Sequence, residues 1–339
     1  MTAVAAPPRL AAVAFGAEPG APVRVRSGAT ALDRWCVAVA LGGQGRYAAA
    51  AAVLEPLLVR PGVPVAVAAH AAVTLAAHRR QLGGHVAARP YDALGLRLAC
   101  SVRDDPHGLA LAARVDALVG LAADAVGTAA PETAKRLLYR ANELLERANA
   151  QVTVNDGGDH SDWAAVGDEA RSNWSWRPSV RLGWVRAELA LACGDAAGAV
   201  EPARAALKLA RVSGSVRHVL KSQIVLAVAE AVAGASSTKA VAELDAAAES
   251  AGQYQLLPLV WPARLAAADL LGHGATAARD ANDGVTKISQ KAVSDRVDGA
   301  ARRRHAALAT LSVIQQRADP IGRRLLGESY RVPAPPPVM

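Results

Sequence analysis

Aromatic side chains are scarce in this sequence, at 4% of 339 residues, although hydrophobic residues make up 52% of the chain. The apolar mass is therefore largely Ala, Leu and Val. A β-sandwich would need many more aromatic and β-branched side chains. Alanine costs no side-chain entropy in a helix and lets neighbouring helices approach closely. The composition therefore predicts an all-α protein.

Cysteine is also rare, and the three cysteines, Cys36, Cys100 and Cys193, are far apart in the chain with no CxxC pair. This spacing argues against a disulfide framework and against a cysteine-based zinc site. All three lie in apolar, helix-like stretches, so we interpret them as small buried hydrophobes in a reducing cytosol.

Long apolar runs are missing too. No run of about 18 residues is free of charges or helix breakers, so no membrane span is expected. The Ala-rich stretch 1–21 has no basic residue before Arg9, and Pro7 and Pro8 interrupt it. We expect a cytoplasmic protein, with a secretory signal peptide as the alternative.

Catalytic motifs are absent: there is no G-x-S-x-G, Walker A or H-E-x-x-H sequence. The stretch 43–48 matches G-x-G-x-x-A, but residues 57–90 contain no Asp or Glu to bind a ribose, so a turn between two helices is expected. Ser236 and Lys239 fit S-x-x-K without its companion motifs, and a serine capping a helix is the simpler interpretation. The sequence predicts no enzyme and no cofactor.

Glycine, proline and polar residues divide the chain into pairs of predicted helices. We expect a flexible tail at 1–29, a helical array at 30–318 with a polar insertion at 151–175, and a Pro-rich tail at 319–339. One elongated array and two separate domains both fit the length. The predicted helices are 31–42 with 45–60, 64–81 with 87–102, 107–126 with 131–150, 177–193 with 195–212, 215–233 with 237–251, 255–272 with 275–291, and a last basic helix at 292–318.

Two helix turns carry a resemblance to a known family. The segment 41–47, followed by Ala50, Ala51, Leu54 and Leu57, resembles the tetratricopeptide repeat, which places small residues where its two helices cross. The segment 191–195 with the small residues after it resembles that pattern as well, and Asp195 is placed to cap the following helix. The Ala-rich pairs are also similar to the sensor arrays of large actinobacterial transcription activators, over about residues 31–290.

This resemblance implies a right-handed solenoid of antiparallel helix pairs. The repeats are irregular, because their lengths vary and Pro56 and Pro202 fall inside predicted helices.

The strongest local anomaly is a segment of sixteen residues rich in Trp and Arg. Both residue types are enriched at binding hot spots. The segment is therefore a candidate partner-binding site, and the alternative is that its rings anchor the insertion onto the array. The candidate residues are Arg171, Trp174, Trp176, Arg177, Arg181, Trp184 and Arg186.

The insertion 155–162 gathers carboxylate and imidazole side chains, which a divalent cation would require. It lacks the spacing of an EF-hand, because the twelfth residue counted from Asp156 is Gly167. A solvated loop is the simpler interpretation, and no metal site is predicted.

Positive charge gathers near the C-terminus. From residue 291 to 339 there are nine Lys and Arg against four Asp and Glu, a local charge of +5 out of +8 for the chain. Such a cluster can attract a polyanion. The candidate polyanion-binding residues are Arg302, Arg303, Arg304, Arg323 and Arg324.

Taken together, the repeats and the missing catalytic motifs predict a protein-binding adaptor or regulatory scaffold whose groove takes a protein or peptide partner. Two alternatives stay open: a nucleic-acid-associated factor that uses the basic C-terminal helix, and a metal-dependent enzyme that uses the insertion.

Overall fold

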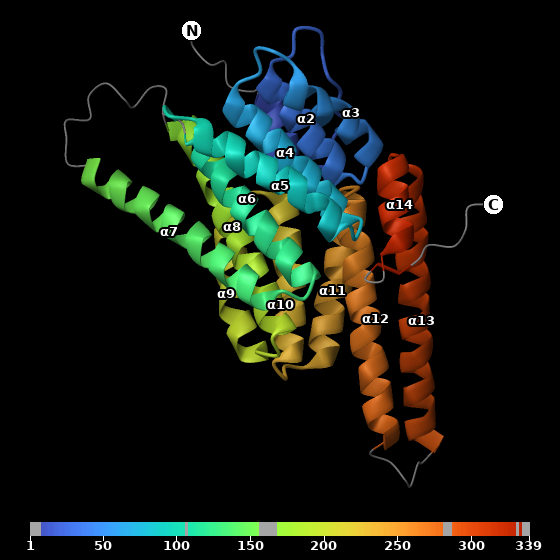
Figure 1. Cartoon of the computed structure of the whole chain (residues 1–339). Coiled ribbons are helices and arrows are strands. Elements are labelled where there is room, and N and C mark those ends of the chain that lie inside the picture. The colour runs from blue at the N-terminus through green and yellow to red at the C-terminus, as the bar shows by residue number, and fades with distance from the viewer. Residues whose placement is uncertain (1–7, 106–107, 156–167, 281–286, 330–331, 334–339) are drawn as a thin grey trace.

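The computed structural model describes residues 8–105, 108–155, 168–280, 287–329 and 332–333, and Figure 1 shows the course of the chain. Side chains are described for residues 10–105, 108–148, 176–273, 291–329 and 332–333. Throughout these ranges the regular secondary structure is helical, and no strand occurs. The all-α prediction is confirmed for this part of the chain.

The helices are α1 (Pro8–Phe15), α2 (Ala31–Gly43), α3 (Tyr47–Val59), α4 (Val65–Gln81), α5 (His85–Ser101), α6 (Leu109–Gly127), α7 (Pro131–Asn155), α8 (Asp168–Ala192), α9 (Ala196–Val212), α10 (Val216–Val232), α11 (Ser237–Gln253), α12 (Leu257–Asp280), α13 (Lys287–Gln316) and α14 (Pro320–Glu328).

Local signals explain several helix starts. Thr30 and Asp33 form a capping box on α2, in which each side chain accepts a hydrogen bond from the other residue's backbone N–H. Asp195 accepts a hydrogen bond from the Gly198 N–H and caps α9, as predicted. Ser236 caps α11, so the S-x-x-K sequence marks a helix start. The glycine-rich stretch 43–48 covers the end of α2, the turn 44–46 and the start of α3.

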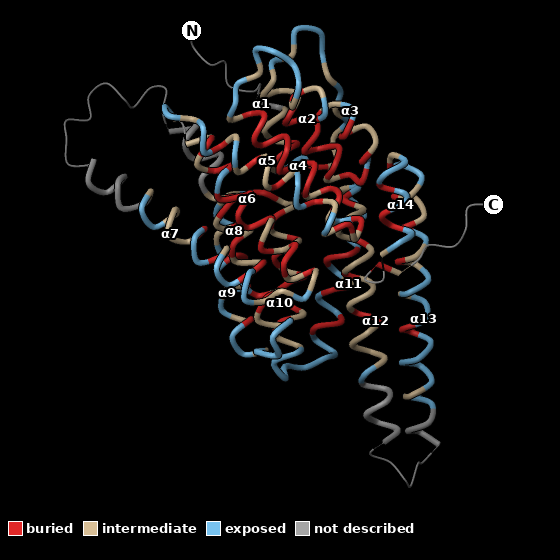
Figure 2. Tube along the Cα trace, in the orientation of Figure 1, coloured by how far each residue is buried: buried red, intermediate tan, exposed pale blue. Residues whose placement is uncertain are grey.

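Each helix packs on the next one along the chain. The buried residues are concentrated in the middle of the molecule, as Figure 2 shows. Small residues make the close contacts: Ala187 of α8, Ala203 of α9 and Ala229 of α10 are fully buried in one cluster. At Gly183 a Cβ atom would lie 2.8 Å from the Pro202 carbonyl oxygen, so α8 and α9 approach closely there. Pro56 and Pro202 lie inside α3 and α9 without ending them.

Helices α3 and α4 contact the C-terminal part of the described chain. The Ala48 N–H of α3 donates to the Arg317 carbonyl after α13, at 2.9 Å. Arg79 of α4 forms a salt bridge with Asp319, at 2.7 Å. A buried apolar cluster joins the same helices, and α14 lies beside the N-terminal helices in Figure 1. Helices α3, α13 and α14 therefore share one core.

Both segments that were predicted to be tails contain packed helices. In α1 the side chains of Val13, Ala14 and Phe15 are buried, and the Gly16 carbonyl accepts a hydrogen bond from the Val216 N–H of α10. In α14 Pro320 stands at the first helical position behind the Asp319 cap, where proline suits a helix. Proline and glycine content was a poor guide here because it marks helix starts as well as disorder.

Three further expectations need correction. Cys36 is buried, but Cys100 and Cys193 are exposed, because they lie at or just beyond the ends of α5 and α8. The last three predicted helices are two, since α12 continues through Gly272 to Asp280 and α13 begins at Lys287. Of the predicted insertion 151–175, residues 151–155 end α7 and residues 168–175 begin α8, while residues 156–167 lie outside the described part of the chain.

None of the helices in the described ranges carries an apolar stretch long enough to cross a membrane.

Candidate functional site

Helix α8 has two faces with different surroundings, and both carry candidate residues. Arg177, Arg181 and Trp184 are spaced by four and three residues, so they share one face of the helix. This face points into the molecule, toward α6 and α10. Arg186 lies on the other side of α8 and is exposed.

The inner face of α8 is anchored by one carboxylate. Asp116 of α6 is fully buried and forms salt bridges with both Arg177 and Arg181, the latter at 2.5 Å. Burial by itself raises the pKa of Asp116, but the two guanidiniums outweigh it and hold this pKa below its usual range. Asp116 is therefore a charged partner that fixes α8 on α6.

The Arg177 guanidinium also lies against aromatic rings of the N-terminal helices. It is 5.6 Å from the ring centre of Phe15 in α1 and 5.7 Å from that of Trp35 in α2. At these distances a guanidinium is attracted to a ring face. Arg177 is 7% exposed. Its side chain is therefore part of the core that joins α1, α2, α6 and α8.

The two described tryptophans of the segment pack around a histidine. The ring centres of Trp176 and Trp184 lie 4.7 and 5.5 Å from that of His218 in α10. The Trp184 indole N–H donates to the Ser222 hydroxyl at 2.8 Å, and Ser215 hydrogen-bonds His218 Nδ1 at 2.8 Å. Both tryptophans are half-buried. Contact between these two rings and a partner stays a prediction.

Burial keeps His218 neutral. It lowers the pKa of His218, and the nearby cation of Arg217 lowers this pKa further. Arg217 donates to the Val39 carbonyl of α2 at 3.2 Å, and burial lowers its own pKa to about 10. The inner face of α8 is thus a packed polar core.

The outer face of α8 borders a surface hollow of about 270 Å³ between α7, α8 and α9. Its apolar walls come from all three helices, and Arg186 and Glu146 supply opposite charges. The hollow is open because α7 packs mainly on α6 and makes few contacts with α8; Figure 1 shows α7 diverging from α8. The principal apolar lining residues are Leu145, Leu182, Pro202, Ala205 and Leu209.

The remaining candidate residues fall in two groups. The side chains of Arg171 and Trp174 lie outside the described residues. Of the polyanion candidates, Arg303 is paired with Asp245 at 2.5 Å and Arg304 with Asp269 at 2.9 Å. Arg302, Arg323 and Arg324 are exposed, and Arg324 lies 3.8 Å from Glu328. These ion pairs lower the positive charge that the basic region offers, and polyanion binding stays a prediction.

The carboxylates and histidine of the insertion, from Asp156 onward, lie outside the described part of the chain. Elsewhere in the described ranges no three His, Cys, Asp or Glu side chains are grouped as a metal ion would need.

Sequence reasoning missed Asp116 and the hollow. A signal for Asp116 was present, because a lone carboxylate in the apolar run 109–123 needs a buried partner. The hollow gave no comparable signal, since it depends on the angle between α7 and α9.

No protein-family model matches this chain, and no curated protein sequence matches it.

Proposed function

We propose that this protein is a helical scaffold that binds a protein partner. In this proposal the helix pairs stack as an irregular right-handed solenoid of antiparallel pairs, and the hollow between α7, α8 and α9 receives a segment of the partner. The observation that carries the proposal is that Leu145, Leu182 and Leu209 line this hollow beside the charged Arg186.

The chemistry of the hollow defines the segment that fits it. Leu145, Leu182 and Leu209 offer apolar contact, as grooves that bind amphipathic helices do. Arg186 is exposed beside them, and an acidic side chain on the partner would pair with it and set the orientation. We therefore propose a partner helix that presents an apolar side chain next to a carboxylate.

The inner face of α8 is a weaker place for this contact. Arg177 and Arg181 are held by Asp116, and Trp184 by Ser222. A partner would have to break these interactions before it could use the same side chains, and leaving the Asp116 charge buried without a counter-charge is costly. The hollow requires no such rearrangement.

A charged side chain placed in the hollow tests the proposal. Ala205 lines the hollow and is exposed, so Ala205→Arg fills the site without entering the core. The matched control is Ala242→Arg on α11, which makes the same change at an exposed helical position away from the hollow. Protein captured from the native host is compared among the wild type and the two variants, each checked by thermal melting.

We expect a partner that the wild type and Ala242→Arg capture equally and that Ala205→Arg loses by about tenfold or more, as for a site with a hot spot. Equal capture by all three proteins would mean that the hollow is not the binding site.

A further inference from the structure

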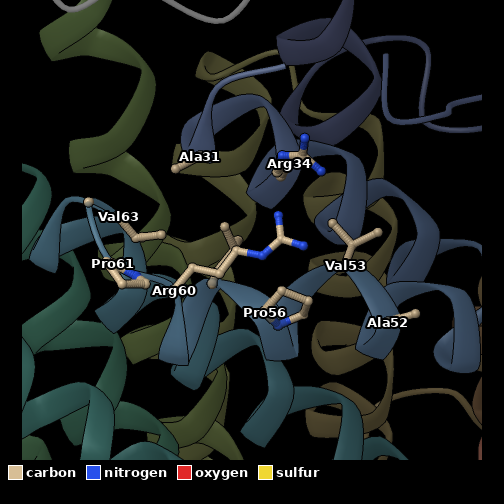
Figure 3. Close-up of a pocket in the computed structure, with 10 residues that line it drawn as sticks. Ala31, Arg34, Ala52, Val53, Pro56, Arg60, Pro61 and Val63 are labelled. Carbon is tan, nitrogen blue, oxygen red and sulfur yellow. The ribbon is translucent and has the colours of Figure 1, made fainter. Parts of the chain in front are cut away.

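A second hollow lies at the N-terminal end of the molecule, and its charges are unbalanced. It has a volume of about 270 Å³ and is formed by α2, α3 and the turn that follows α3. Arg34 of α2 and Arg60 at the end of α3 both line it, and Figure 3 shows the Arg60 side chain crossing the hollow toward Arg34. Two like charges thus face the same space.

No carboxylate of the described residues balances them. Neither arginine forms a salt bridge within the described ranges, and no acidic residue lines the hollow. The nearest acidic residue in sequence, Asp33, does not line the hollow, and its Oδ2 accepts hydrogen bonds from the Thr30 backbone and hydroxyl, at 3.0 and 2.9 Å. Glu55 of α3 is exposed and does not line the hollow.

The positions of the two arginines are partly fixed. Arg34 is half-buried, and its Nε donates to the Ala29 carbonyl at 3.3 Å, which leaves the Nη groups for another acceptor. Ala31, the first residue of α2, lines the same hollow.

The rest of the wall is apolar. Val53, Pro56 and Val63 surround the arginines, as Figure 3 shows. A cation pair between apolar walls suits a ligand that is anionic at one end and apolar at the other. The hollow is slightly smaller than the roughly 300 to 1,000 Å³ of sites for drug-sized molecules.

We propose that this hollow binds a phosphate monoester that carries a small apolar group. A phosphate monoester has a charge of about −1.5 to −2 at neutral pH, which matches two guanidiniums better than a single carboxylate does. Arginine also presents a planar fork of donors that fits phosphate oxygens. The site is separate from the hollow between α7, α8 and α9 and does not depend on the function proposed above.

Phenyl phosphate is the probe, titrated into the full chain by isothermal calorimetry. The comparison ligands are inorganic phosphate, which lacks the ring, and benzoate, which has the ring with a single negative charge. We expect phenyl phosphate to bind more tightly than either of them, and to bind more weakly as salt is raised. If inorganic phosphate bound as tightly as phenyl phosphate, the apolar walls would not contribute to binding. If benzoate bound as tightly, the hollow would not select a dianion. Either result would overturn the proposal.

Substitutions locate the site. Arg34→Gln and Arg60→Gln should each weaken binding by about tenfold or more, since each removes charge-assisted hydrogen bonds. Arg114→Gln is the matched control, because it removes an exposed arginine of α6 outside the hollow and should leave binding unchanged.

Ala52 allows a test that removes neither arginine. It is exposed and lines the hollow, so Ala52→Glu places a carboxylate beside the arginines, whereas Ala52→Gln adds the same bulk without charge. Ala52→Glu should abolish binding, and Ala52→Gln should weaken it less. Wild-type affinity in Ala52→Glu, or no binding of phenyl phosphate to the wild type at millimolar concentration, would overturn the proposal.

Discussion

Asp116 illustrates how one side chain decides the role of a whole segment. Its carboxylate lies 2.5 Å from Arg181 and also pairs with Arg177, so the Trp/Arg segment that stands out in the sequence is turned inward at these residues. Composition identified the unusual segment. It did not identify which side faces the core, because that depends on a carboxylate some 60 residues away.

Removing the Asp116 charge should therefore destabilise the fold. Asp116→Asn leaves two arginines without their counter-charge in the interior, and we expect a loss of about 3 to 5 kcal/mol in the free energy of unfolding. Asp269→Asn is the control, because Asp269 pairs with Arg304 at an exposed position and should cost at most about 1 kcal/mol. Urea denaturation measures both. Similar losses in the two variants would show that Asp116 is not a buried anchor.

Buried histidines should make the fold sensitive to acid. Burial lowers the pKa of His70 and His78 to about 3 and that of His218 well below its usual value, whereas burial raises the pKa of Asp92 to about 7. Between about pH 4.5 and 6 the unfolded chain carries protons on these three histidines, which the native protein leaves neutral, whereas the native protein carries a proton on Asp92 that the unfolded chain lacks. Stability should therefore fall with falling pH, by roughly 2 to 3 kcal/mol per pH unit at most.

His78 provides the test of this pH dependence. His78→Phe keeps an aromatic ring and removes one titrating group, so the slope should decrease by about 1.4 kcal/mol per pH unit. The control is His305→Phe, which makes the same change at an exposed position of α13. Equal slopes for the wild type and His78→Phe, from urea denaturation at several pH values, would contradict a neutral buried His78.

At the scale of the helices, sequence reasoning was most accurate where the residues that cap or end a helix lie next to it in the sequence. Glycine and capping residues gave the bounds of α2 to α6 and α9 to α11 to within about two residues. The predicted end of α12 was wrong, because Gly272 lowers helix stability without ending the helix. Sequence reasoning failed at α1 and α14 because their helical state depends on burial against distant helices, which no local pattern reveals.

The close contact of α8, α9 and α10 gives a prediction at this scale. Ala203 is fully buried against Ala187 and Ala229. Ala203→Phe should lower the free energy of unfolding by about 1 to 3 kcal/mol or more, because the contact has no room for a ring. Ala242→Phe on the surface of α11 is the control and should stay within about 0.5 kcal/mol of the wild type. Unchanged thermal stability of Ala203→Phe would contradict this packing.

At the scale of the molecule, contacts between distant parts of the chain set the arrangement. Arg79 and Asp319 are 240 residues apart in sequence, and Arg217 reaches Val39 across 178 residues. Such pairs could not be predicted, because each residue alone is an ordinary charged side chain. The candidate partner site shows the same limit: Arg186 was identified from its neighbours in sequence, while the hollow it borders depends on how α7 and α9 are placed.

The most direct test of partner binding in this hollow is photo-crosslinking from position 205. A photoreactive amino acid replaces Ala205, and the same amino acid replaces Ala242 in the control protein. We expect the partner that the wild type captures to crosslink from position 205 and not from position 242. A partner that crosslinks from position 242 but not from position 205, or equally from both, would contradict the assignment of the hollow between α7, α8 and α9 as the binding site.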